Sequence, residues 1–112
     1  MAKFKTELDE NLIRFIGEQK MFFTSTAPLK GRINLSPKGI DTFRCLDNKT
    51  VGYLDLTGSG NETSAHIQEN GRITIMFCSF TDKPLILRLY GQGEIVKKES
   101  DKWNELIPNF KR

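Results

Sequence analysis

Hydrophobic and polar residues alternate most regularly between residues 32 and 36. In an extended strand successive side chains point to opposite faces, so Arg32, Asn34 and Ser36 share one face. Ile33 and Leu35 share the other. A strand that is buried on one side would turn its two apolar residues toward the core and present a cation, an amide and a hydroxyl in a row on its other face.

Other short stretches combine β-branched and aromatic residues and are separated by turn-forming residues, a pattern typical of antiparallel strands. Every second residue of such a strand is expected to face a common core. The predicted strands cover residues 21–26, 32–36, 42–46, 51–56, 72–80 and 85–96, with turns at 28–31, 37–39, 47–49 and 81–84. The residues expected in the core are Ile33, Leu35, Leu54, Leu56, Ile73, Ile75, Phe77, Leu85, Leu87 and Leu89.

Three stretches carry the signals of helices. Thr6 can cap a helix whose apolar residues recur at helical spacing and which ends near Gly17. A second helix is expected over residues 61–70, because Gly71 provides a left-handed C-terminal cap. A third is expected over residues 100–107. These elements together predict a mainly β (α+β) fold: an antiparallel barrel, split or closed, with flanking short helices.

The junction between residues 57 and 60 joins a predicted strand to the second predicted helix. Its sequence, Thr-Gly-Ser-Gly, leaves the backbone open to close approach, and a helix start offers unpaired N–H groups and a positive partial charge. Hydroxyl groups of Thr57, Ser59 and Thr63 can add hydrogen bonds, so the junction suits a phosphate monoester. The same residues equally fit an ordinary capped helix that follows a loop.

Glu62 lies in the first turn of the same predicted helix. A carboxylate there complements the helix dipole by itself and repels a phosphate dianion. A phosphate at this junction therefore needs a cation from elsewhere in the chain, and the candidates are Arg32 and Lys38.

The composition restricts the class of protein. A chain of 112 residues, with 38% hydrophobic and 28% charged residues, is ordinary for one small globular domain, here residues 1–112. No apolar run approaches the ~18 residues of a membrane span, and the first ten residues lack the apolar centre of a signal peptide, so we expect a cytoplasmic protein. The net charge of +3 favours anionic small molecules, but the chain lacks the Lys/Arg clusters of a nucleic-acid surface.

Few residues are suited to catalysis. Cys45 and Cys78 lie in apolar segments without a CxxC motif, so we expect both to be small buried hydrophobic residues. His66 is the only histidine, no serine stands in a GxSxG motif, and no metal site is recognisable. We therefore expect His66 on a helix surface, assign no catalytic residue, and expect a cofactor to carry any difficult chemistry.

Four blocks in the same order resemble one known family. RINLSPKGIDTF, GYLDLTGSGNETSAHI, ENGRITIMFCSF and LRLYGQGEIV are similar to the pyridoxamine 5′-phosphate oxidase-like family of flavin-binding split β-barrel proteins, over about residues 8–103. The resemblance implies a homodimer that binds flavin mononucleotide (FMN) in a cleft between its subunits. The positions that it carries over as FMN-binding are Arg32, Asn34, Ser36, Lys38, Thr57, Ser59, Asn61 and Thr63.

The chain also departs from the family pattern. The oxidase proper has Ser-Arg-Lys where residues 61–63 are Asn-Glu-Thr, so we expect a different phosphate grip and do not expect pyridoxamine phosphate as the substrate. Relatives of this subgroup tend to extend further at the C-terminus, so we expect a segment that could cover the flavin to be absent.

Three functions remain open. The leading hypothesis is an FMN-dependent oxidoreductase of unknown substrate, in which a deazaflavin or haem could replace FMN. A second is a small basic barrel that binds single-stranded nucleic acid through Phe22, Phe23 and Tyr53. A third is a barrel that binds another ligand or protein without redox activity. The second is disfavoured because Met76 and Phe77 lie in apolar strands that suit a core rather than a binding surface.

Overall fold

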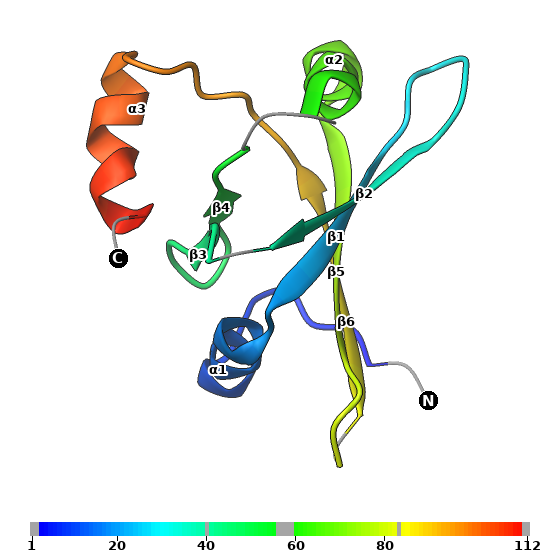
Figure 1. The fold of residues 1–112 in the computed structure, drawn as a ribbon, viewed down its shortest axis with the longest axis vertical. Coiled ribbons are helices and arrows are strands. Elements are labelled where there is room, and N and C mark those ends of the chain that lie inside the picture. Colours follow the sequence, from blue (N-terminus) through cyan, green and yellow to red (C-terminus); the bar gives the residue numbers. More distant parts are fainter. Residues whose placement is uncertain (1–2, 40, 56–59, 83, 111–112) are drawn as a thin grey trace.

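The computed structural model of the chain describes residues 3–39, 41–55, 60–82 and 84–110 (Figure 1). Within these residues the elements follow in the order α1 (Glu10–Glu18), β1 (Met21–Thr26), β2 (Asn34–Gly39), β3 (Phe43–Cys45), β4 (Val51–Tyr53), α2 (Gly60–Asn70), β5 (Arg72–Ser79), β6 (Leu85–Gln92), α3 (Asp101–Leu106) and the 3-10 helix η1 (Ile107–Phe110).

The strands form two antiparallel sheets. The larger sheet has the strand order β2-β1-β5-β6, and the smaller consists of β3 paired with β4. Figure 1 shows α1, α3 and the β3–β4 hairpin on one side of the larger sheet, with α2 over its end. The predicted class is confirmed, because antiparallel strands dominate and short helices flank them. Within the described residues the two sheets do not close into one continuous barrel.

The ends of the helices follow local capping chemistry. Asp9, not Thr6, caps α1, because its carboxylate accepts a hydrogen bond of 2.8 Å from the Leu12 N–H. The expected cap of α2 is confirmed: Gly71 has a φ of 75° and its N–H donates to the carbonyl of Ile67.

Several strand boundaries differ from the prediction: β2 begins at Asn34 instead of residue 32, and β4 ends at Tyr53 instead of residue 56. Residues 37–39, expected in a turn, lie within β2. As an edge strand β2 tolerates Pro37, which has no backbone hydrogen to donate. β6 ends at Gln92 rather than continuing to Val96, because the Gly93 N–H turns to donate to the carbonyl of Gly71.

The inner face of the larger sheet carries both the aromatic core and a polar region. Thr24 lies opposite Ser36 on β2 and Ile75 on β5, so these residues share the face that meets the helices. Toward α1 this face is apolar. The ring of Phe22 lies 5.0 to 5.7 Å, between centroids, from three other aromatic rings, those of Phe43, Tyr53 and Phe77.

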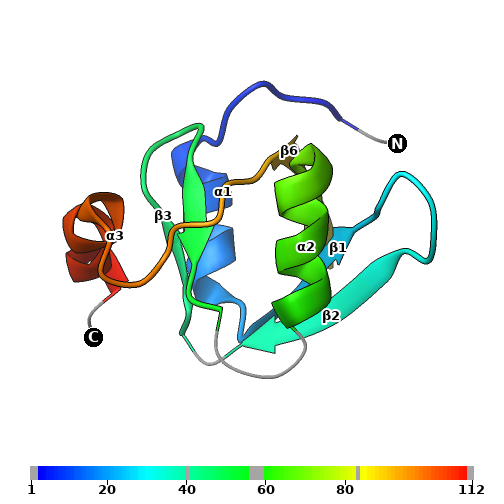
Figure 2. The ribbon, with the colours of Figure 1, turned by 90° about the horizontal axis from the view of Figure 1, so that it is seen from above.

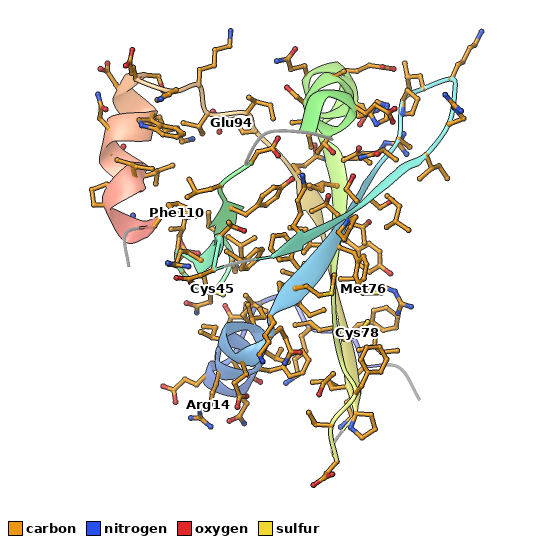
Figure 3. The ribbon with its side chains drawn as sticks, in the orientation of Figure 1. Arg14, Cys45, Met76, Cys78, Glu94 and Phe110 are labelled. Carbon is orange, nitrogen blue, oxygen red and sulfur yellow. The ribbon has the colours of Figure 1, made fainter. Side chains whose placement is uncertain are left out.

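We call the opposite side of this sheet the outer face. Met76 and Cys78 of β5 project to this side, away from the β3–β4 hairpin (Figure 3). No helix of the described chain covers it (Figure 1). By the strand register the outer face consists of Met21, Phe23 and Ser25 of β1, Leu35, Pro37 and Gly39 of β2, Arg72, Thr74, Met76 and Cys78 of β5, and Ile86, Arg88, Tyr90 and Gln92 of β6.

The prediction that Ile33 and Leu35 are buried is wrong for the protomer, where they are 72% and 66% exposed. The reason is the register, which pairs Thr24 with Ser36 and so turns the polar residues of β2 inward. Leu85 is also exposed. The prediction is confirmed for Ile75 and Phe77, which are buried; Leu54, Ile73, Leu87 and Leu89 are half-buried, and Leu56 lies outside the described residues.

Both cysteines are free and half-buried rather than fully enclosed. They lie on different sheets, Cys45 on β3 and Cys78 on the outer face of β5 (Figure 3). Burial raises the pKa of the Cys45 thiol, which keeps it protonated and unreactive near neutral pH.

Candidate functional site

Helix α2 lies over the polar part of the inner face, beside β1 and β2 (Figure 2). Four hydrogen bonds connect it to the β1–β2 hairpin. Near the end of the helix Asn70 donates to the Ala27 carbonyl and Glu69 accepts from the Leu29 N–H, and two further contacts lie closer to its start. The side-chain amide of Asn34 donates to the Thr63 hydroxyl at 2.8 Å, and the Thr26 hydroxyl shares a 2.9 Å hydrogen bond with Nδ1 of His66. Because the two contacts lie about one helical turn apart, they fix both the position and the rotation of α2 on the sheet.

Three of the eight residues predicted to bind FMN meet in this polar region. The Ser36 hydroxyl donates to the side-chain carbonyl of Asn34 at 3.4 Å, and the amide of Asn34 in turn donates to Thr63. Ser36 and Thr63 are both buried. The three side chains therefore form one connected network that holds the first turns of α2 in place.

Lys38 makes an ion pair with Asp55. Its Nζ atom lies 3.1 Å from Oδ1 of the carboxylate. The Lys38 side chain is only 10% exposed, whereas that of Asp55 is 39% exposed. Asp55 belongs to the segment that runs from β4 toward α2, so Lys38 is an enclosed cation beside the chain that enters this helix.

Arg32 lies apart from this cation. It is exposed, and it has no hydrogen-bond or ion-pair partner among the described residues. Arg32 lies six positions before Lys38 and precedes β2, and six residues of extended strand span on the order of 20 Å. At that separation the two side chains would not reach one phosphate in the same protomer.

The other predicted ligands lie at the strand-to-helix junction. Asn61 is in the first turn of α2. Thr57 and Ser59 fall outside the residues that the structure describes.

Tyr53 and Thr24 add polar groups close to the ion pair. Burial raises the pKa of the Tyr53 phenol, the Asp55 carboxylate raises it further, and the Thr24 hydroxyl opposes the shift. The phenol therefore remains neutral and able to donate at physiological pH. The Thr24 hydroxyl is fully buried and meets the distance and angle of a hydrogen bond with none of the described groups, so its interaction with the Tyr53 phenol is weak.

The sequence interpretation placed His66 wrongly and overlooked Asp55. His66 is buried against Thr26 instead of lying on the helix surface. The sequence does contain a pattern that indicates a buried His66. Residues 63, 66, 67 and 70 recur at helical spacing, so they share one face of α2. No sequence pattern identifies Asp55, since its pairing with Lys38 depends on how two distant segments fold together.

A cavity of about 320 Å³ lies between α1 and β3. Phe22, Phe43 and Phe77 form part of its wall, with Lys20 and Arg44 also lining it. None of the predicted FMN ligands lines this cavity.

The described part of the chain contains neither a metal-binding cluster nor a membrane-spanning helix. There, no three His, Cys, Asp or Glu side chains gather so as to hold a metal ion. None of the described helices combines the length and the apolar character needed to cross a membrane.

Comparisons with known proteins agree with the resemblance in the sequence. The family model described as pyridoxamine 5′-phosphate oxidase matches residues 8–111. The pyridoxamine 5′-phosphate oxidase family protein ustO of Aspergillus flavus is 44% identical over 108 residues, which cover 94% of this chain and 41% of that protein. The chain thus spans less than half the length of this relative. No solved structure matches it.

Proposed function

This chain belongs to the pyridoxamine 5′-phosphate oxidase family, and on that premise we propose that it is a flavoprotein that binds FMN. The observation that carries the proposal is the enclosed ammonium group of Lys38 beside the segment that enters α2. A phosphate at the start of α2 needs such a cation, because Glu62 of the same helix is acidic.

The described residues fit a phosphate group at this place. The first N–H groups of the eleven-residue helix α2 have no partners within the helix and attract an anion. Lys38 supplies the positive charge, while Asn34, Ser36 and Thr63 fix the helix on the sheet. Thr57, Ser59 and Asn61 remain proposed ligands. We assign Arg32 to a different part of the ligand or to the partner protomer, because of its distance from Lys38.

We further propose that the protein is an oxidoreductase whose side chains bind and orient the cofactor. Bound FMN would supply the redox chemistry, since a flavin accepts or donates a hydride. His66 is buried and hydrogen-bonded to Thr26, which argues against proton exchange with a substrate.

A homodimer formed through the outer face is part of the proposal. Leu35, Ile86 and Tyr90 are all more than half exposed on that face, as is the adjoining Ile33. Exposed apolar residues that share one face of a sheet are typical of interaction surfaces. A second copy of the chain, related by a twofold axis, offers an identical apolar patch to cover it.

Binding of single-stranded nucleic acid has no comparable support. Phe22 is 3% exposed and packs against Phe43 and Phe77, so its ring is not available to stack on a base.

The visible absorption spectrum of freshly purified protein tests the proposal. We expect the bands of oxidised flavin, and chromatography of the released chromophore should identify FMN rather than a deazaflavin. A haem spectrum would contradict the proposal, and so would a colourless protein that takes up no FMN when FMN is added.

A further inference from the structure

We propose that Asp55 sets the selectivity of the site for phosphorylated ligands by competing with the phosphate for Lys38. This inference rests on the proposed binding of FMN. Asp55 is not among the residues predicted to bind FMN. Only its ion pair with Lys38 identifies it.

The two partners of the ion pair are buried to different extents. Lys38, at 10% exposure, is held among protein atoms, whereas Asp55, at 39%, already faces water. An ammonium group that loses its partner in such a place is destabilised, because little water replaces the lost contact. A carboxylate that turns outward is solvated. An incoming anion can therefore displace Asp55 from Lys38, while Lys38 stays where it is.

The local charges decide which anions can do this. Asp55 and Glu62 are both acidic and belong to the segment around the start of α2, and Lys38 is the cation paired there. A weak or singly charged ligand gains little by replacing a carboxylate that already neutralises Lys38. A phosphate monoester carries nearly two charges and three acceptor oxygens, so it forms stronger charge-assisted hydrogen bonds than the carboxylate it replaces.

Replacing Asp55 with asparagine separates competition from other roles. Asparagine keeps the shape of the side chain and can still accept a hydrogen bond from Lys38, but it lacks the competing charge. We expect Asp55→Asn to bind FMN about tenfold more tightly and riboflavin, which lacks the phosphate, with unchanged affinity. Asp55→Ser should also increase the affinity for FMN. This variant replaces Asp55→Asn in the measurement if the asparagine variant folds poorly.

Glu94→Gln is the matched control. Glu94 pairs with Lys102 at 2.7 Å, and both side chains are well exposed. It follows Gly93, which bonds to Gly71 at the far end of α2 from the proposed phosphate position. The control therefore alters the net charge by the same amount without releasing Lys38, and its FMN affinity should equal that of the wild type.

The double variant Lys38→Ala/Asp55→Asn tests whether the gain passes through Lys38. It should show none of the increase seen in Asp55→Asn. The inference is overturned if Asp55→Asn binds FMN no more tightly than the wild type, or if FMN and riboflavin change equally. The inference is also overturned if Glu94→Gln gains as much FMN affinity as Asp55→Asn, or if the double variant keeps the gain in FMN affinity.

Inorganic phosphate provides a probe that does not depend on flavin. At constant ionic strength, replacing chloride with phosphate should raise the thermal unfolding midpoint of Asp55→Asn more than that of the wild type or the double variant. If no variant binds flavin but this difference holds, the proposed function fails and the competition for Lys38 stands. If the wild type binds FMN and neither measurement distinguishes Asp55→Asn, only the inference fails.

Discussion

The Thr26 hydroxyl and Nδ1 of His66 lie 2.9 Å apart in the buried contact between β1 and α2. Two residues earlier on the same face of β1, the buried Thr24 hydroxyl has no hydrogen-bond partner among the described groups. The same residue type thus occurs twice on one strand, once with a partner and once without.

This difference predicts opposite responses to one substitution. Thr26→Val leaves a buried imidazole nitrogen without its partner, so we expect the free energy of unfolding to fall by about 1–3 kcal/mol. Thr24→Val removes a hydroxyl whose described interaction is a weak one with the Tyr53 phenol, so we expect a change within about 0.5 kcal/mol or a gain. Urea unfolding of both variants checks this. A large loss in Thr24→Val would reveal a partner for that hydroxyl.

Two glycines should respond oppositely to alanine. Gly71 has a φ of 75°, and an added Cβ would lie 2.5 Å from the side-chain oxygen of Gln92, so Gly71→Ala should lower the unfolding free energy by at least about 1 kcal/mol. Gly17 lies in α1 with open space around it, so Gly17→Ala should raise it by about 0.5–1 kcal/mol. Thermal unfolding measures both, and a stabilised Gly71→Ala would refute the left-handed cap.

Stability should decline at alkaline pH in a way that depends on Tyr53. Its pKa is raised in the folded protein by burial and by Asp55, so in the pH range above ~10 the unfolded chain releases the phenol proton more readily. The folded state then holds more protons, and the unfolding free energy falls as the pH rises. Tyr53→Phe lacks this contribution, so its stability should fall less steeply above pH ~10. Parallel slopes for the two proteins, measured by urea unfolding, would count against the raised pKa.

The outer face should govern the oligomeric state. Placing a charge on it by Ile86→Glu should convert a dimer to a monomer, because a buried carboxylate without a partner opposes association. Leu29→Glu is the control, since Leu29 is also exposed to solvent but lies between β1 and β2, outside that face. Light scattering gives the mass of each variant. A dimer that survives Ile86→Glu, or a monomeric wild type, would contradict a dimer formed through the outer face.

The local elements of the fold were largely predictable. Helix ends follow short-range chemistry, so Gly71 at the end of α2 and Ser100 at the start of α3 mark boundaries that the sequence alone indicates. The strands follow from their composition in the same way. The alternation in residues 32–36 also predicted two faces, but it did not show which face meets the core.

That ambiguity has a physical cause. Ile33 and Leu35 were assigned to the core because they are apolar, yet an apolar sheet face can equally serve an interface. The register with β1 determines which face of β2 meets the core. Thr24 lies opposite Ser36, so the polar side of β2 turns inward beneath α2. The pairing of Lys38 with Asp55 was unpredictable for a similar reason, since it arises from contacts between distant segments.

The most direct test of the account is the affinity of the protein for FMN and for riboflavin, measured by isothermal titration for the wild type and Lys38→Ala. If Lys38 holds the phosphate, Lys38→Ala should weaken FMN binding on the order of 10- to 100-fold, the loss of a charge-assisted contact of ~1.5–3 kcal/mol. Riboflavin affinity should stay the same. Equal losses for both ligands, or no FMN binding by the wild type, would contradict a phosphate site formed by Lys38 and the start of α2.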